Sequence, residues 1–315
     1  MKLKLVIKIG ISVLFAAWLA FKIDVPSLID ILLTVKPELY IAATLLLFVN
    51  SVVLALKYRL VMRPSGIYQP LLRLVKINFI CRFYSMFLTT AVGQGVIRWH
   101  ISTKNQAERI KFISVMVFER STFLLVLLFT VLFSSFFIAL SDIHTILNKL
   151  YPFLIIGLVT VLLYFFYLSN SGAHRFIKNL FLTLPGKTKN RFIAGAIDWL
   201  SADSIFYKRQ KMLAGSLIIA FVWQFLFLVR VYLLSCAIDT PLGFGHIAWM
   251  ASMVLLLQLI PITLSGIGLR EGAYAYLFRI QDLPPESGAA LGILLLSHIL
   301  LMAVAGGLIV LFFEK

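Results

Sequence analysis

The sequence predicts an all-α polytopic membrane protein with about six full spans, two re-entrant or broken-helix elements and an inverted repeat relating its two halves. Apolar residues make up 61% of the 315 residues, charged residues only 13%, and the mean hydropathy is +0.98. These values are typical of membrane proteins rather than of soluble globular ones. The apolar residues form continuous runs, which favours helices over the alternating strands of a membrane β-barrel.

The net charge of +16 has two interpretations. A basic chain can bind nucleic acid, whereas in a membrane protein basic residues gather in cytoplasmic loops that face anionic lipid. The second interpretation is favoured, so we expect membrane lipids, and no nucleic acid, as partners. Cys81 and Cys236 both occur in apolar runs and are expected to be small core residues, not a disulfide or a metal pair.

Six apolar segments are long enough to cross a bilayer, which needs about twenty residues per helix. They cover about residues 5–22, 39–56, 112–140, 151–169, 212–237 and 287–312. The first follows a basic start and resembles a signal peptide, but many apolar segments follow it, so we interpret it as an uncleaved span. We therefore expect a single transmembrane domain over residues 1–315.

Two further segments, residues 71–92 and 247–280, are apolar but irregular. With the N-terminus in the cytoplasm, the basic stretches 57–111 and 170–211 lie inside, and the acidic turn 281–286 lies outside, as the positive-inside rule expects. This assignment requires both irregular segments to return to the side from which they enter. We expect two re-entrant elements, with both termini on the cytoplasmic side of the cell (inner) membrane. Because residues 95–111 are polar, the first element can alternatively be mostly interfacial.

An inverted repeat follows from this topology. The first half-repeat covers residues 1–140 and the second covers residues 151–315; the two halves share the order span, span, re-entrant element, span, with opposite orientation. The tips of the irregular elements are weakly similar, GQGVIR at 93–98 and GIGLR at 266–270. Such repeats with broken helices are an architecture of secondary transporters. The cytoplasmic segment 170–211 is expected to hold an amphipathic helix, which lies on the inner leaflet or packs on the helical core.

Motifs of catalysis and cofactor binding are absent from the sequence. Each tip contains Gly-x-Gly, but neither follows a strand in a βαβ unit, and there is no P-loop. The five histidines are scattered without the spacing of metal ligands. We therefore expect no cofactor, no metal and no enzyme activity.

Several charges occur inside the apolar segments, where they usually face a partner or a polar cavity. They are Arg98, Glu119, Arg120, Arg270 and Glu271. Adjacent helical residues point about 100° apart, so Glu119 and Arg120 cannot pair with each other and each needs a partner elsewhere; we hypothesise pairs of Glu119 with Arg270 or Arg98, and of Arg120 with Glu271. A further arginine, Arg230, is expected to snorkel to the outer interface.

The stretch PITLSGIGLREG, residues 261–272, interrupts an apolar run with Pro261, Ser265, Gly266 and Gly268. A helix that restarts after these glycines exposes backbone N–H groups with partial positive charge. An arginine there adds a fork of donors that fits a phosphate. This predicts a headgroup-binding or gating site, with Gly93 and Gly95 forming a similar break at the first tip. The alternative is that the glycines only allow a turn and that Arg270 and Glu271 lock helices together.

Three motifs carry a resemblance to a known family. LIPITLSGIGLREGAYAYLF at 259–278 is similar to the Pro-x-Ser-x-Gly-Gly-x-Gly-x-Arg-Glu-Gly pattern of the flippase-like transmembrane region of lysylphosphatidylglycerol synthases. VMVFERSTFLLVLL resembles its Glu-Arg helix, and FLTTAVGQGVIRWHIS its Pro-x-x-x-Gly-Gly-Asp-x-x-Arg segment. Where that segment usually has Gly-Asp, this chain has Gln94 and Gly95. The sequence ends at FFEK without the aminoacyl-transferring domain, so the resemblance implies a stand-alone member.

The resemblance implies lipid translocation. We expect the protein to bind an anionic lipid headgroup, such as that of an aminoacylated phospholipid or a polyprenyl-phosphate lipid. The alternatives are a membrane scaffold for a partner synthase or glycosyltransferase, and an intramembrane lipid-modifying enzyme.

Overall fold

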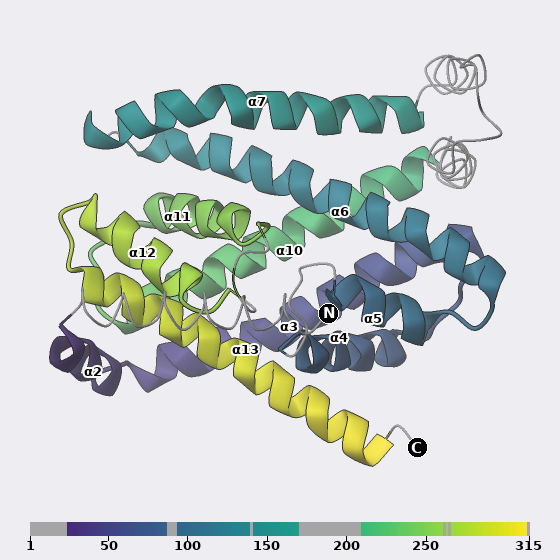
Figure 1. The fold of residues 1–315 in the computed structure, drawn as a ribbon, viewed down its shortest axis with the longest axis horizontal. Helices are drawn as coiled ribbons and strands as arrows, with labels where there is room; N and C mark the ends of the chain where they lie inside the picture. Colours follow the sequence, from purple (N-terminus) through teal and green to yellow (C-terminus); the bar gives the residue numbers. More distant parts are fainter. Residues whose placement is uncertain are drawn as a thin grey trace.

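The computed structural model describes residues 24–86, 93–138, 141–169, 209–260, 263 and 266–313. These residues form ten α-helices and two short 3-10 helices, with no strand among them (Figure 1). The α-helices are α2 (Val25–Leu33), α3 (Pro37–Met62), α4 (Leu71–Ser85), α5 (Gly93–Ser102), α6 (Gln106–Ser134), α7 (Ser141–Ser169), α10 (Gln210–Ala237), α11 (Phe244–Leu257), α12 (Leu269–Arg279) and α13 (Pro285–Phe313). The 3-10 helices are η1 (Arg63–Ser65) and η2 (Ser135–Phe137). The all-α class predicted from the sequence is thus confirmed.

Five described helices are long and apolar enough to cross a membrane. The candidate spans are Pro37–Ser65, Gln106–Ser134, Leu150–Leu168, Gln210–Ala237 and Pro285–Phe312, with hydropathies of 2.0 to 2.3 in four of them and 2.5 in the last. They correspond to five of the six predicted spans; α6 begins before residue 112 and ends at Ser134 rather than at 140. The predicted span 5–22 and nearly all of the segment 170–211 lie outside the described residues.

Besides α2, which has nine residues, four described helices are much shorter than these candidate spans. Helices α4, α5, α11 and α12 have 15, 10, 14 and 11 residues. At 1.5 Å per residue they extend about 15 to 23 Å, less than the ~30 Å core of a bilayer. They occupy the two irregular segments of the sequence. The first segment continues past residue 92, because α5 forms its second arm.

These short helices make two hairpins that enter the bundle from opposite ends. The Gln69 side chain, just before α4, donates a hydrogen bond to the carbonyl of Ser102 at the end of α5, at 3.2 Å. Both ends of the α4–α5 hairpin therefore lie together. Beyond α12, Ile280 and Leu283 pack in the same core cluster as Leu242, which precedes α11. In Figure 1, α4 and α5 lie in the right half of the molecule, and α11 and α12 in the left half.

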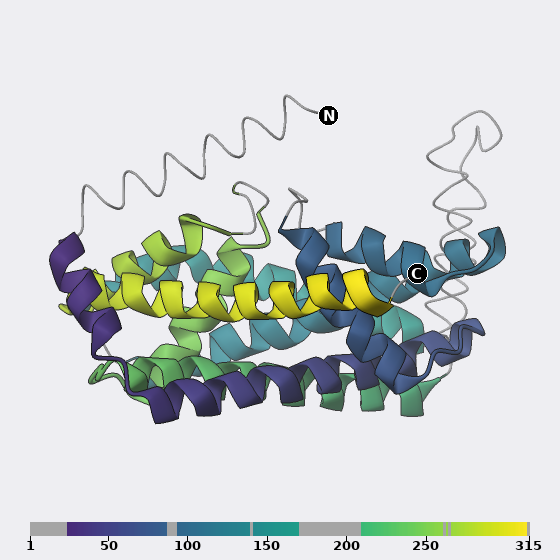
Figure 2. The same ribbon diagram turned by 90° about the horizontal axis from the view of Figure 1, so that it is seen from below.

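The long helices surround these hairpins. Helices α3 and α10 run side by side, as Figure 2 shows, and the Lys36 N–H at the start of α3 donates to the Ala237 carbonyl at the end of α10, at 3.0 Å. The two helices are therefore antiparallel. Helix α13 packs against α12 and α4, and α6 packs against α11 and α7.

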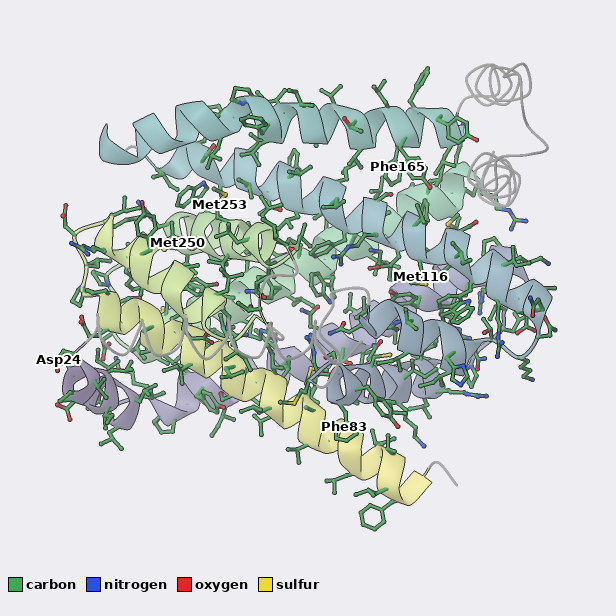
Figure 3. The ribbon with its side chains drawn as sticks, in the orientation of Figure 1. Asp24, Phe83, Met116, Phe165, Met250 and Met253 are labelled. Carbon is green, nitrogen blue, oxygen red and sulfur yellow. The ribbon has the colours of Figure 1, made fainter. Side chains whose placement is uncertain are left out.

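Glycine lets α13 approach α12 closely. A Cβ atom added at Gly288 would lie 2.5 Å from the Tyr274 carbonyl oxygen, and one at Gly292 would lie 2.8 Å from the Cα of Glu271. The two glycines are four residues apart, the spacing that brings membrane helices into backbone contact. This contact fixes the beginning of α12 inside the bundle. Farther along α13, Phe83 of α4, labelled in Figure 3, lies where a side chain at Gly307 would stand.

Candidate functional site

A cavity of about 470 Å³ lies where the inner ends of both hairpins meet. Its wall combines the end of α4, the beginning of α5, the residues after α11 and the residues before α12 with the middle of α3, α6 and α10. The volume falls in the range of roughly 300–1,000 Å³ that is usual for small-molecule sites. The charged side chains on the wall are Lys57, Arg82, Arg98, Glu119 and Arg120. Among the described residues, four cations therefore line the cavity together with one carboxylate.

Arg98 is held in place from two sides. Its Nη1 donates to Oδ1 of Asn78 on α4 at 2.6 Å, and its guanidinium carbon lies 3.8 Å from the ring centroid of Tyr58 on α3. The Asn78 amide in turn donates to the Ser51 carbonyl at 2.8 Å. These two direct neighbours are uncharged, so the acid that acts on Arg98 is the more distant Glu119, within Coulombic reach but without an ion pair. Arg98 is thus a rigidly placed cation on the cavity wall.

Lys57 and Glu119 form an ion pair close to Tyr58 and within Coulombic reach of Arg98. The Lys57 Nζ lies 3.4 Å from Oε1 of Glu119, and also 3.5 Å from the Glu119 carbonyl oxygen. Lys57 is almost fully buried, whereas the Glu119 side chain remains 17% exposed. This pair replaces the hypothesised pairs of Glu119 with Arg270 or Arg98. The sequence does not reveal it because α3 and α6 meet only through the tertiary fold.

Arg82 and Arg120 have no acid within ion-pairing distance among the described residues. Arg82 is half-buried at the end of α4 and lies within Coulombic reach of Arg98 and Arg270. Arg120 projects from α6, and its guanidinium lies 5.6 Å from the ring centroid of Phe123. The hypothesised pair of Arg120 with Glu271 is wrong. Both guanidinium groups are available for an anion in the cavity.

The second half of the chain supplies neutral polar groups to the same cavity. Gln224 of α10 donates weakly to Ser252 at 3.4 Å, and its Oε1 has no partner in the described part of the chain. The hydroxyl of Thr263 also lacks a partner there, and Gln258 completes this wall. Buried polar atoms without a partner are costly and are usually satisfied by water or a ligand.

Apolar side chains cover the remaining wall. Phe123 and Trp223 meet edge to face, with centroids 5.9 Å apart, and Met116 of α6, labelled in Figure 3, lies beside α5. A cavity with one cationic wall, one amide wall and an aromatic surface matches an amphiphile with an anionic headgroup.

The predicted helix break is present at the beginning of α12. Gly266 and Gly268 both have φ of +79°, a conformation that favours glycine, and α12 starts at Leu269. Gly266 lines the cavity. Pro261 and Ser265 lie outside the described residues. At the first tip, Gly93 begins α5, and Gly95 lines the cavity against Met116.

Arg270 and Glu271 pair with each other just behind the cavity. The Nη2 and Nε of Arg270 donate to Oε1 of Glu271 at 2.6 and 3.1 Å, and Nε also lies 3.2 Å from the Gly292 carbonyl of α13. Oε2 of Glu271 accepts from the Gly268 N–H at 2.7 Å. The positive end of α12 is thus capped by its own carboxylate. This geometry corresponds to the alternative in which the two residues lock helices together.

The structure therefore brings three predicted residues, Arg98, Glu119 and Arg120, onto one cavity wall, and sets Arg270 and Glu271 behind it. Sequence reasoning missed Lys57 and Arg82 as site residues. Their position could have indicated a role in a site, because both follow or interrupt apolar runs, where a charge is costly. Arg230 also differs from expectation: its Nε is buried without a partner in the described chain, within Coulombic reach of Arg82 and Arg270, so it faces inward.

The fold and the cavity define a polytopic helical membrane protein with a cation-rich internal site. A comparison with protein families identifies it further. Residues 5–307 match the lysylphosphatidylglycerol synthase TM region, which is nearly the whole chain, and the protein belongs to this family. The family to which the resemblance points is thereby confirmed. No curated protein and no solved structure matches the chain.

Proposed function

We propose that the protein translocates a lipid, with its anionic headgroup passing through the cavity and its hydrocarbon chains remaining in the bilayer. The observation that carries this proposal is the cavity wall, on which the described residues place four cations together with one carboxylate. Uncompensated charge deep in a membrane protein is costly and marks a path for a substrate or ion. Membership of the flippase-like family supports the same role. No enzymatic step is proposed.

The packing supports an inverted repeat in which α3 to α6 correspond to α10 to α13. Helix α3 packs on α4 as α10 packs on α11, and α5 packs on α6 as α12 packs on α13. Between the halves, α13 packs on α4 as α6 packs on α11, and α3 lies against α10. Exchanging the halves thus preserves the pattern of neighbours. We propose that both hairpins are re-entrant and that rocking of one half against the other opens the cavity to each leaflet.

The distribution of charge supports an orientation. Arg63 and Arg209 line one shallow pocket, at the end of the bundle where α3 ends and α10 begins. At the other end, Lys36 pairs with Asp239, and the Asp24 N–H donates to Glu286 at 3.3 Å. By the positive-inside rule, the end with Arg63 faces the cytoplasm. The end of α13 lies at this basic end, and we propose that both termini do so.

Reconstitution in liposomes tests the function. The purified chain would be inserted into vesicles that carry a fluorescent lipid in both leaflets, and a membrane-impermeant quencher would report movement between leaflets. Arg120→Gln removes a cation that has no partner to lose, so the fold should survive. Arg73→Gln, an exposed change on α4 outside the cavity, is the matched control. We expect wild type and Arg73→Gln to move lipid and Arg120→Gln to move it at least tenfold more slowly.

The alternative functions make different predictions in this assay. If no lipid moves with any variant that elutes as a folded particle, the scaffold interpretation replaces the proposal. A chemically altered lipid recovered from the vesicles would instead indicate an intramembrane enzyme.

A further inference from the structure

The net charge of the cavity distinguishes between headgroup classes, and this inference rests on the proposed lipid site. Glu119 is the described acid on the wall and pairs with Lys57 at 3.4 Å; it lies within Coulombic reach of Arg98, but Arg82, Arg98 and Arg120 form no ion pair among the described residues, so the wall keeps a net positive charge. These three guanidinium groups come from three consecutive helices, α4, α5 and α6. The facing wall offers amides and a hydroxyl from Gln224, Gln258 and Thr263, and no charge.

We propose that the cavity selects lipids whose headgroup is a phosphate monoester or diphosphate, and that it disfavours aminoacylated headgroups. A phosphate monoester carries roughly −1.5 to −2 charges at pH 7 and has three acceptor oxygens. Guanidinium groups match such oxygens with paired, charge-assisted hydrogen bonds. A lysylated phosphatidylglycerol presents ammonium groups that outnumber its single phosphodiester charge. Those groups would meet three arginines without a carboxylate to receive them.

The described residues near the cavity offer no place for an ammonium group. Glu119 is the one described carboxylate on the wall, and Lys57 already pairs with it. Glu271, behind the wall, accepts from Arg270 and from the Gly268 N–H. Asn78, which orients Arg98, uses its acceptor oxygen for that arginine. The other described acceptors on the wall, such as Oε1 of Gln224 and the hydroxyl of Thr263, are neutral, and a neutral group gives a cation much less than a carboxylate does.

The three arginines differ in how freely they can move, which assigns them different parts in binding. Arg98 is held by Asn78 and Tyr58 and therefore supplies a positive charge at a fixed position on the wall. Arg82 and Arg120 have no described polar partner, so they can turn onto phosphate oxygens without breaking an existing bond. Arg82 also lies within Coulombic reach of Arg98 and Arg270, and a bound dianion would relieve this repulsion.

Binding of defined lipids to the purified full chain in one detergent tests the selection. The probes are phosphatidic acid and a polyprenyl monophosphate, which share a monoester on different chains, with phosphatidylglycerol and lysyl-phosphatidylglycerol as comparisons. Native mass spectrometry would give their relative affinities, and inorganic phosphate would be added as competitor. We expect both monoesters to bind about tenfold or more tightly than phosphatidylglycerol, with the lysylated lipid weakest.

Variants connect this order to the cavity. Arg82→Gln and Arg120→Gln should each weaken monoester binding by about tenfold while leaving phosphatidylglycerol within about threefold, because the dianion makes the additional contact. Arg73→Gln should change neither. Circular dichroism and elution volume would establish folding, and if Arg82→Gln fails to fold, Arg120→Gln carries the test alone.

The outcomes separate this inference from the proposed function. Lysyl-phosphatidylglycerol binding as tightly as phosphatidic acid would overturn the selection but would leave lipid translocation standing. Stabilisation by inorganic phosphate, with no preference for any lipid, would overturn it in favour of a free phosphate ligand. If the wild-type protein bound no lipid more tightly than the Arg120→Gln variant does, both the selection and the proposed lipid site would be refuted.

Discussion

Replacing Arg270 by methionine should destabilise the fold severely, and the structure gives the size of the effect. Arg270 and Glu271 are 2% and 5% exposed, and Arg270 is the source of both hydrogen bonds to Oε1 of Glu271. The substitution leaves a buried carboxylate with one described donor, the Gly268 N–H, and removes the contact with the Gly292 carbonyl. Loss of one partner of a buried ion pair costs about 3–5 kcal/mol.

The second change of this experiment removes the uncompensated charge. Glu271→Gln, added to Arg270→Met, leaves a neutral side chain whose oxygen still accepts from Gly268, so the double variant should recover at least half of the lost stability. The double-variant cycle gives the interaction free energy of the pair. Unfolding in detergent would be followed by fluorescence-detected size exclusion after heating, and by denaturant titration where it is reversible.

The refuting result is specific. If Arg270→Met unfolds within about 0.5 kcal/mol of wild type, the range of a neutral surface change, then the pair is not a structural lock. Loss of lipid binding in such a stable variant would restore Arg270 as a headgroup contact. Stability lost in Arg270→Met and not recovered in the double variant would mean that packing of the arginine stem, not the unpaired carboxylate, dominates.

Three further changes test other parts of the structure. Gly292→Val places a Cβ atom 2.8 Å from the backbone of Glu271 and should cost about 1–3 kcal/mol, whereas Gly157→Ala, whose Cβ would meet a Leu128 methyl at 3.4 Å, should be neutral in the same denaturation assay. Glu119→Gln frees Lys57 and should tighten phosphatidic acid binding about threefold or more, as titration by native mass spectrometry would show. Gly95→Asp adds an acid to the wall and should weaken that binding about tenfold; unchanged affinity would contradict the charge argument.

The long helices and the break before α12 were predictable because their causes are local. A run of about twenty apolar residues suffices for a span, and α3, α10 and α13 follow such runs closely. The glycines at 266 and 268 mark a turn that few other residues adopt, and both have positive φ. The sequence also indicated that the inner ends of the hairpins carry polar groups, because charged residues occur there within apolar runs.

The partners of the charges were not predictable, because they depend on which helices become neighbours. Lys57 lies 62 residues before Glu119, and no pattern in either helix encodes their contact. Arg270 and Glu271 pair with each other and not with Arg120 or Glu119. They lie in the first turn of α12, where the Glu271 side chain folds back towards the helix start and accepts from the Gly268 N–H. The sequence left open whether these two residues bind a headgroup or lock helices together, because that depends on the fold around the helix end.

The cavity gives a physical reason why the departure from the family pattern at the first tip matters. In the resemblance, Gly95 stands where relatives usually carry aspartate, three residues before Arg98, and the structure places Gly95 on the cavity wall. An aspartate there would put a second carboxylate among the cations and give an ammonium group a partner. Without it, Glu119, which pairs with Lys57, is the one described carboxylate on the wall with the three arginines. On the proposed lipid site, aspartate at this position would favour a mixed-charge headgroup and glycine a phosphate dianion; the Gly95→Asp variant, whose Cβ also has to displace the Met116 methyl group, tests that difference.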